Sequence, residues 1–194
     1  MPDLVKTIAF LGSPRKDGNT DLLLQETVKG IESSGLSVKT FRLNLMNIKP
    51  CQNCGGCEEK GECIINDDMA EIYRDIRSSD RVILASPVFF FALSAQTKIM
   101  IDRCQSFWCE KYLLKKPLPE GEHGRKGLLL LAGGMKKEIG IECSENTARA
   151  FFRTISVPEH NTLSYLGVDA KGAILEHPTA LKEAFEAGKQ LVAE

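Results

Sequence analysis

Short apolar runs that alternate with amphipathic segments constrain this chain more than any other feature. Strands are predicted where the runs have strand length and end at turn residues, at 7–12, 37–43, 81–86, 127–134 and 161–168. Helical spacing of apolar residues predicts helices at 20–35, 66–80, 93–114, 143–155 and 177–194. Strands that alternate with helices favour a parallel sheet covered on both faces. We therefore expect an α/β fold with a doubly wound, five-stranded parallel sheet.

Composition and charge exclude several classes of function. The 194 residues carry 25 Lys and Arg against 26 Asp and Glu, so no basic excess exists to attract nucleic acid or an anionic membrane. No apolar run reaches the roughly 18 residues of a membrane span, and the first residues lack the pattern of a signal peptide. We expect a cytoplasmic protein with neither nucleic-acid nor membrane partners.

The loop after the first predicted strand, GSPRKDGNT (12–20), carries the donors of an anion site. It offers hydroxyls, an amide and a cation, at Ser13, Arg15, Asn19 and Thr20. A helix follows, with Asn19 or Thr20 as its expected N-cap, and backbone N–H groups at a helix N-terminus favour an anion. The spacing matches neither a Walker motif nor GxGxxG. The pattern favours a bound monophosphate over an ordinary turn with a capping residue.

Two further loops follow strands at the same edge of the predicted sheet. The aromatic-rich PVFFF (87–91) can flank a flat ring, and the glycines at 133 and 134 let backbone approach a planar ligand. Each signal is weak alone, since the phenylalanines could belong to the core. The acidic residue expected about 20 positions after a dinucleotide fingerprint is missing. Together with the phosphate loop, these patterns favour flavin mononucleotide (FMN).

Four of the seven cysteines fall within CQNCGGCEEKGEC (51–63). Two overlapping C-x2-C turns bring the thiols of Cys51, Cys54 and Cys57 to one side of the loop. A five-residue spacer then allows Cys63 to reach the same place as a fourth ligand. Such a set suits one [4Fe–4S] cluster, whereas structural zinc uses two separated knuckles. An odd cysteine count and a reducing compartment argue against disulfides. We favour a cluster; idle thiols, zinc and disulfides are the alternatives left open.

Several motifs together resemble the NADPH-dependent FMN reductase family over about residues 6–192. They are the strand-SPR-x-x-GNT-helix opening, the SPVFF loop, K…DR at Lys98–Arg103, LAGG, and the tail LGVDAKGAILEHP (166–178). The compact cysteine loop followed by NDDM is similar to that of the iron-sulfur flavoprotein branch. The resemblance implies a flavodoxin-like fold, with one FMN-binding domain over 1–194 and an inserted cysteine loop at 50–63.

The same resemblance implies roles for individual residues. It assigns the FMN phosphate to Ser13, Arg15, Asn19 and Thr20. It assigns the edge of the isoalloxazine ring to Pro87, Val88, Phe89 and Phe90, and the pyrimidine side to Gly133 and Gly134. Many relatives carry Tyr where this chain has Phe89, so a hydrogen bond from that hydroxyl is absent here.

An FMN beside a cluster predicts an FMN-dependent electron-transfer oxidoreductase, because clusters exchange one electron while flavins exchange one or two. The resemblance implies a ferredoxin-like donor, a small acceptor such as oxygen, peroxide or a quinone, and a homodimer or homotetramer. The alternative is a cluster-free NAD(P)H-dependent FMN or quinone reductase, in which Lys136 or Lys137 attracts the nucleotide's phosphates. A third hypothesis, a non-enzymatic thiol or metal sensor, lacks a DNA-binding element or basic face.

The remaining notable residues receive no catalytic role. Core positions or partly exposed thiols are expected for Cys104, Cys109 and Cys143. Scattered loop positions are expected for His123, His160 and His177. Trp108 and Tyr112 fit a partner subunit and the core equally well, and Asp67 is the expected cap of the helix over 66–80.

Overall fold

Five parallel strands form the central sheet in the computed structural model, which describes residues 4–193. They are β1 (Thr7–Leu11), β2 (Val38–Arg42), β3 (Arg81–Phe89), β5 (Lys126–Gly133) and β6 (Glu159–Leu166). All neighbours in the order β2-β1-β3-β5-β6 are parallel, and the order reverses between β1 and β3. This is the flavodoxin-like strand order. The predicted fold class is confirmed.

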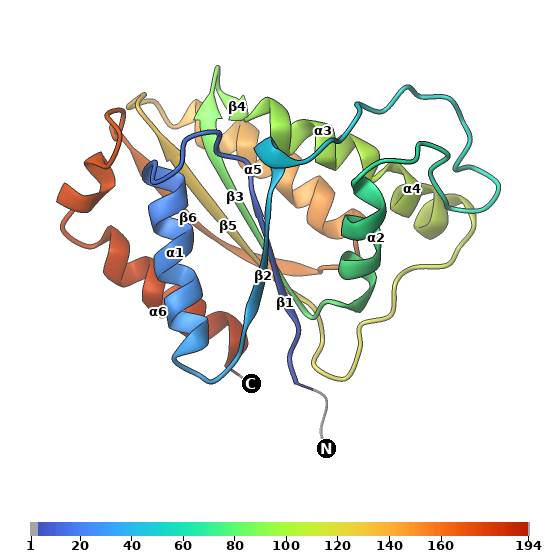
Figure 1. Ribbon diagram of the computed structural model, residues 1–194, viewed down its shortest axis with the longest axis horizontal. Coiled ribbons are helices and arrows are strands. Elements are labelled where there is room, and N and C mark those ends of the chain that lie inside the picture. Colours follow the sequence, from blue (N-terminus) through green and yellow to red (C-terminus); the bar gives the residue numbers. More distant parts are fainter. Residues whose placement is uncertain (1–3, 194) are drawn as a thin grey trace.

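Helices cover both faces of the sheet (Figure 1). One face packs against α1 (Asn19–Glu32) and α6 (Ala180–Val192). The other packs against α2 (Met69–Ser78), α3 (Ala95–Arg103), α4 (Gln105–Trp108) and α5 (Ile139–Thr154). Short helical turns are η1 (Leu43–Leu45), η2 (Cys109–Leu113) and η3 (Ala173–Glu176). Among residues 4–193, no helix combines the length and apolar character that crossing a bilayer requires.

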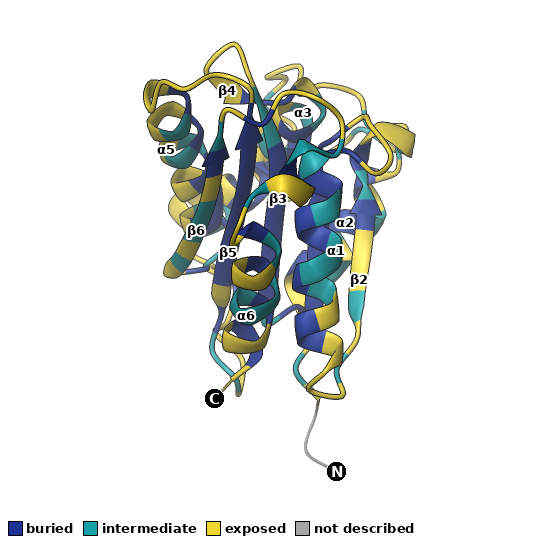
Figure 2. Ribbon diagram, turned by 90° about the vertical axis from the view of Figure 1, so that its left-hand side faces the viewer, coloured by how far each residue is buried: buried dark blue, intermediate teal, exposed yellow. Residues whose placement is uncertain are grey.

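Alternation along the central strands supplies both hydrophobic cores. In β1, Ile8 and Phe10 join the core under α2 and α5, while Ala9 and Leu11 join the core under α1 and α6. Figure 2 shows the central strands buried and the outer helix faces exposed. A strand buried on both faces reads as a continuous apolar run, which is why these strands are recognisable in the sequence.

The single long helix predicted over 93–114 is wrong. Leu93 belongs to a short strand, β4 (Ala92–Leu93), which pairs antiparallel with the end of β3. The helix α3 ends at Arg103, Cys104 separates it from α4, and the chain continues as the π-helical turn η2. Residues 93–114 contain neither Gly nor Pro, so no local signal marks the break.

Both predicted N-caps are also wrong. The N-cap of α1 is Gly18, so Asn19 and Thr20 lie inside the first helical turn. The N-cap of α2 is Asp68, and the preceding Asp67 accepts the N–H of Met69 and also pairs with Arg103. In both cases a polar side chain near the start of the helix makes a hydrogen bond or ion pair with a distant residue, which the local sequence does not indicate.

Candidate functional site

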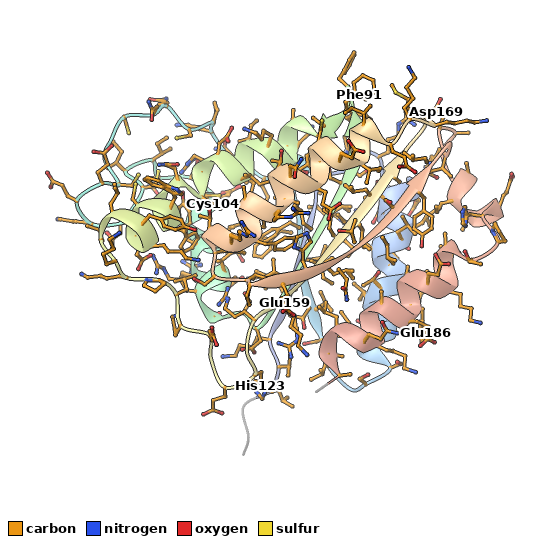
Figure 3. The ribbon with its side chains drawn as sticks, turned by 180° about the vertical axis from the view of Figure 1, so that it is seen from behind. Phe91, Cys104, His123, Glu159, Asp169 and Glu186 are labelled. Atoms are coloured by element: carbon orange, nitrogen blue, oxygen red, sulfur yellow. The ribbon has the colours of Figure 1, made fainter. Side chains whose placement is uncertain are left out.

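A cleft lies where β1, β3 and β5 end, and we call it the strand-end cleft. The expected FMN residues that line it are Ser13, Arg15, Asn19, Thr20, Pro87, Val88, Phe89, Gly133 and Gly134. Phe90 does not line it. Figure 3 shows Phe91 and Asp169 at this end of the molecule and His123 at the opposite end.

The loop between β1 and α1 presents hydrogen-bond donors to this cleft. Leu22 N–H is bonded to the carbonyl of Gly18, so the N–H groups of Asn19 and Thr20 precede the first bond of the helix ladder. The buried Ser13 hydroxyl lies 3.3 Å from the backbone nitrogen of Arg15, whose side chain is exposed. Free N–H groups, the positive helix end and a guanidinium together suit a phosphate.

Asp21 fixes the shape of this loop from beneath. Its buried carboxylate accepts hydrogen bonds from both terminal nitrogens of the Arg42 guanidinium, at 3.0 and 3.1 Å. It also accepts a hydrogen bond from the backbone N–H of Asp17, at 2.9 Å. Burial alone opposes ionisation, but these hydrogen bonds outweigh it and hold the pKa of Asp21 below its ordinary value. The paired Arg42 compensates a negative charge that would otherwise repel an anion in the cleft.

The side chain of Asn19 joins the start of α1 to the segment that follows β6. Its amide nitrogen donates to the carbonyls of Val168 and Ala170, each at 3.0 Å, and its oxygen accepts the N–H of Ile174 at 3.2 Å. These bonds hold the segment after β6 against the start of α1. Asn19 therefore offers the cleft its backbone N–H, and its side chain positions the wall that carries Asp169 and Lys171.

A buried hydroxyl network joins the first two loops of the cleft. The Ser94 hydroxyl donates to the carbonyl of Gly12 at 2.8 Å and caps α3 by accepting the N–H of Thr97. The Ser86 hydroxyl accepts the N–H of Ser94 at 3.0 Å. A Cβ on Gly12 would lie 1.8 Å from Thr97 Oγ1, so a glycine is required at this crossing. The ends of β1 and β3 are thereby held in one geometry.

The aromatic loop forms a tight hairpin between β3 and β4. Phe89 pairs with Ala92, and the two-residue turn between them is Phe90 and Phe91, with φ of +48° and +64°. Left-handed backbone in two successive bulky residues is strained, because the side chain clashes with the backbone at positive φ. Two-residue hairpin turns of this kind therefore usually carry Asn-Gly. The Phe90 side chain is fully exposed and does not line the strand-end cleft.

The third wall of the strand-end cleft combines small and charged residues. A Cβ on Gly134 would lie 2.7 Å from Asp169 Oδ1, so this glycine admits the loop that carries Asp169. Asp169 and Lys171 line the cleft and were not singled out from the sequence, although both lie in the tail motif 166–178. Lys136 and Lys137 are exposed and do not line it.

The cysteine loop borders a second, smaller cavity, which we call the cysteine cavity. All four expected ligands line it: Cys51, Cys54, Cys57 and Cys63. The opposite wall comes from the region of α4, through Arg103, Gln105, Ser106 and Cys109. In Figure 1 the loop projects beyond α2 and α4 at the side of the sheet.

Two turns shape the cysteine loop. The N–H of Glu58 bonds to the carbonyl of Gly55 at 3.0 Å, and the N–H of Gly61 bonds to the carbonyl of Cys57 at 2.8 Å. Gly55 and Gly61 have φ of +71° and +72°, which glycine adopts without steric cost. These turns place Cys57 between two tight bends, with Cys63 following the second.

Arg103 closes the neck of the loop. Its side chain is fully buried and pairs with the equally buried Asp67, with Nη1 2.6 Å from Oδ2. It also donates to the carbonyls of Lys49 at 2.8 Å and Ile65 at 3.3 Å, on the two sides of the loop. Asp67 accepts the N–H of Lys49 at 2.9 Å. The cysteine loop is thus anchored at both ends by one ion pair.

Cys109 is the residue of this cavity that sequence reasoning missed. Its sulfur lies 3.5 Å from that of Cys57, although 52 residues separate them, and its side chain is buried. Burial, followed by the hydrogen bond with Cys109, raises the pKa of the Cys57 thiol to about 12. The core position expected for Cys109 is confirmed, and its contact with Cys57 is what the sequence did not indicate.

The four thiols of the cysteine cavity are donors of the kind that an iron-sulfur cluster takes. Within residues 4–193, no group of three or more His, Cys, Asp or Glu side chains is gathered tightly enough to hold one ion. The Nε of Arg103, which borders the cavity, is buried without a hydrogen-bond partner among the described residues. Four thiols and a spare cationic donor suit an anionic cluster.

Comparison with known sequences identifies the family. The profile of a family described as NADPH-dependent FMN reductase matches residues 5–163. An iron-sulfur flavoprotein of Archaeoglobus fulgidus is 36% identical over 135 residues, which cover 70% of this chain and 59% of that protein. One of Methanocaldococcus jannaschii is 40% identical over 99 residues, 51% of each chain. The chain matches little more than half the length of these two relatives. Another A. fulgidus iron-sulfur flavoprotein is 32% identical, and 67% of its length is covered.

Solved structures share the fold over nearly the whole chain. An NAD(P)H:quinone oxidoreductase from Methanothermobacter marburgensis has a TM-score of 0.75 at 15% identity, with 99% of each chain covered. An FMN-dependent NADH-azoreductase from Bacillus anthracis, in complex with FMN, has a TM-score of 0.73 at 16% identity, covering 98% of this chain and all of that one. At such identities the likeness shows the fold alone. The sequence matches show that this chain belongs to the NADPH-dependent FMN reductase family of FMN-dependent oxidoreductases, in its iron-sulfur flavoprotein branch.

Proposed function

We propose that the chain, as one domain over 1–194, binds FMN in the strand-end cleft and a [4Fe–4S] cluster in the cysteine cavity, and passes electrons between them. The observation that carries the proposal is that the four loop cysteines line one cavity, separate from a cleft bordered by the phosphate and aromatic loops. When bound, the cluster supplies one-electron exchange and the flavin one- or two-electron exchange.

The chain's own residues bind and orient the flavin in this proposal. The phosphate is held by the backbone N–H groups of Asn19 and Thr20, the Ser13 hydroxyl and the Arg15 guanidinium. Pro87–Phe89, Gly133 and Gly134 line the same cleft and would hold the ring. Phe90 is left out as a wall because it is fully exposed. No general base is needed, since the cofactors carry the reaction.

The cluster is held by Cys51, Cys54, Cys57 and Cys63, and the Arg103–Asp67 pair fixes the loop that carries them. The buried Nε of Arg103 and the backbone N–H groups of the loop turns are donors that lower the cost of an anionic guest. None of the described residues lines both cavities. Electrons exchanged between the two sites would therefore have to pass through the protein that separates them, either within one chain or between subunits.

A homodimer or homotetramer is part of the proposal. Trp108 and Tyr112 are 38% and 39% exposed, with ring centroids 5.6 Å apart, on the helical segment beside the cysteine cavity. Partly exposed aromatic pairs are favourable anchors for a subunit contact. A ferredoxin-like donor and a small acceptor such as oxygen, peroxide or a quinone complete the proposed reaction in a cytoplasmic setting.

Replacing Arg15 by alanine is expected to weaken FMN binding by about 10- to 100-fold, because a charge-assisted hydrogen bond contributes about 1.5–3 kcal/mol. Riboflavin binding should hardly change, since riboflavin lacks the phosphate. Quenching of flavin fluorescence on titration with the flavin-free protein measures both affinities.

Lys16→Ala is the matched control for Arg15→Ala. Lys16 is the adjacent cation, equally exposed, and does not line the strand-end cleft. FMN affinity should stay within about twofold of the wild type, as an exposed charge outside the site contributes little. Equal losses for both variants, or equal losses for FMN and riboflavin, would show that Arg15 does not hold the phosphate.

The alternative function is a cluster-free NAD(P)H-dependent FMN or quinone reductase. The observation that favours it is the cation Lys171 in the wall of the strand-end cleft, where a nucleotide phosphate could approach. The two structural neighbours carry NAD(P)H or NADH in their names. Rapid bleaching of the bound flavin by NADPH in an iron-free preparation would support this alternative, whereas slow bleaching there favours the ferredoxin-linked route.

A further inference from the structure

Cys57 and Cys109 make a contact that the proposed cluster does not require. Their sulfurs are 3.5 Å apart, and within the described part of the chain this is the one hydrogen bond that joins two cysteines. Cys57 comes from the cysteine loop and Cys109 from η2, the π-helical turn after α4. The tertiary fold therefore creates this thiol pair, and the C-x2-C spacing of the loop does not.

We propose that Cys57 and Cys109 are a redox-active dithiol, which forms a disulfide in the cluster-free protein and withholds Cys57 from cluster assembly until it is reduced. The withholding rests on the proposed function, since it takes Cys57 to be a cluster ligand. The disulfide itself does not depend on that assignment.

The geometry requires only a small movement. The two sulfurs must close from 3.5 Å to the ~2.05 Å of a disulfide. Cys109 is 1% exposed, is one of the buried core residues and belongs to the helical turn η2. Cys57 is half-buried and belongs to a loop without strands or regular helix, so it is the partner free to adjust. A bond between them would join the loop to the body of the protein.

Other cysteine pairs are less well placed. Cys51 and Cys54 are exposed and make no hydrogen bond to another thiol among the described residues, and Cys63 is half-buried without a thiol partner there. The C-x2-C spacing nevertheless permits a disulfide within the loop. A Cys54–Cys57 bond is thus the competing product that an experiment must distinguish.

The oxidation balances with hydrogen peroxide as the two-electron oxidant. The half-buried Cys57 thiol takes one oxygen atom from the peroxide, which gives a sulfenic acid and one water. The Cys109 thiol then attacks that sulfur, the S–O bond breaks, an S–S bond forms, and a second water leaves. Two thiols lose two protons and two electrons in total. A dithiol such as dithiothreitol reverses the change by thiol–disulfide exchange.

The consequence for the cluster follows from ligand count. A [4Fe–4S] cluster takes four thiolates, and the loop supplies four. With Cys57 in a disulfide only three are left, and Cys109 is occupied by the same bond. The dithiol therefore makes cluster assembly depend on reducing conditions, and protects Cys57 from further oxidation when the cluster is lost.

Peptide mapping tests the disulfide directly. The full-length protein is stripped of iron with a chelator, reduced, desalted and exposed to hydrogen peroxide. Burial limits the access of peroxide to both thiols, so the exposure lasts hours. Free thiols are then alkylated, and trypsin yields the peptide 43–60, with Cys57, and the peptide 104–111, with Cys109. We expect these two peptides to be linked in most chains, with fragmentation placing the bond at Cys57 and Cys109.

Two variants control this experiment. Cys109→Ala should abolish the link between the peptides, and Cys109→Ser should do the same if the alanine variant folds poorly. Cys143→Ala removes an exposed thiol that lies outside the cysteine cavity and should behave as the wild type. Unchanged FMN binding in each variant shows that the fold is intact. A bond confined to peptide 43–60, or free thiols throughout, would overturn the proposal.

Iron uptake tests whether the disulfide keeps Cys57 from cluster assembly. When ferrous iron and only four equivalents of sulfide are supplied without dithiothreitol, and peptide mapping shows that the disulfide persists, oxidised wild type should take up about tenfold less iron than reduced protein, because three thiolates hold a cluster weakly. Dithiothreitol should restore uptake, and oxidised Cys109→Ala should match its reduced form. Equal uptake by oxidised and reduced wild type, or lost uptake in oxidised Cys109→Ala, contradicts the withholding. Absence of uptake by reduced wild type contradicts the proposed function and leaves the disulfide standing.

Discussion

Replacing Cys54 by alanine is expected to remove iron and acid-labile sulfide from the anaerobically purified protein while FMN stays bound. A cluster with one of its four thiolate ligands missing is held weakly. Cys54 is exposed and makes no contact with the strand-end cleft, and the loop neck is fixed by Arg103 and Asp67 instead. Iron, sulfide and flavin assays on the same sample measure the two cofactors separately.

Cys143→Ala is the control for this change. Cys143 is an exposed thiol on α5, so its removal matches the chemical change without touching the cysteine cavity. It should retain iron, sulfide and FMN at wild-type levels. Retention of all the iron by Cys54→Ala would remove Cys54 from the ligand set. Loss of FMN along with iron in a folded Cys54→Ala protein would contradict the two-site arrangement.

Replacing Asp67 by alanine should lower the free energy of unfolding by about 3–5 kcal/mol, because it leaves a buried charge without its partner. The Arg103 and Asp67 side chains are both fully buried. The change also removes the hydrogen bonds that the Asp67 carboxylate accepts from the N–H groups of Lys49 and Met69, at 2.9 and 3.1 Å. Urea unfolding of the reduced, iron-free protein with saturating FMN measures the loss.

Lys98→Ala serves as the control for the Asp67 change. Lys98 pairs with Asp102 on the exposed side of α3, with half of its side chain in solvent, so its removal should cost less than about 1 kcal/mol. Should Asp67→Ala fail to fold, Asp67→Asn keeps the shape and removes the charge. A loss below about 1 kcal/mol in either Asp67 variant would show that this ion pair does not anchor the loop.

The same ion pair predicts a pH dependence. Burial opposes ionisation of Asp67, but hydrogen bonds from Arg103 and two backbone N–H groups outweigh it, so its pKa in the folded state is below the ordinary value. The stabilisation is therefore complete above the unfolded pKa of about 3.9 and is lost as pH falls through the folded pKa. The difference in stability between wild type and Asp67→Asn should shrink below about pH 4 in urea unfolding.

The sequence predicts the sheet well because each central strand is buried on both faces. Residues such as Leu128–Leu131 in β5 then form continuous apolar runs that glycines terminate. The strand-end cleft follows from the same pattern, since the carboxyl ends of parallel strands meet at one edge. Its loops are local motifs, readable within about ten residues.

Contacts between distant segments escape such reasoning. Asn19 bonds to Val168 across 149 residues, which makes its side chain a tie within the fold. Arg103 reaches Asp67 across 36 residues and ends α3 without a glycine or proline to signal it. The break after α3 precedes η2, whose first residue is Cys109, and neither the spacing nor the composition of that helix indicates contact with Cys57.

The phenylalanine turn shows a different limit. Local rules favour Asn-Gly where the structure has Phe90 and Phe91 at positive φ, so the sequence predicts a loop here and does not indicate the hairpin. The register between β3 and β4 and the surrounding network of Ser86 and Ser94 hold this strained turn. Tertiary contacts override the local preference here.

The most direct test of the central claim is the number of iron, acid-labile sulfide and FMN molecules per chain after anaerobic purification. One cluster and one flavin per chain predict about four iron, four sulfide and one FMN. FMN without iron or sulfide under those conditions would contradict the cluster assignment and leave a plain FMN-dependent reductase. Absence of FMN would contradict the assignment of the strand-end cleft.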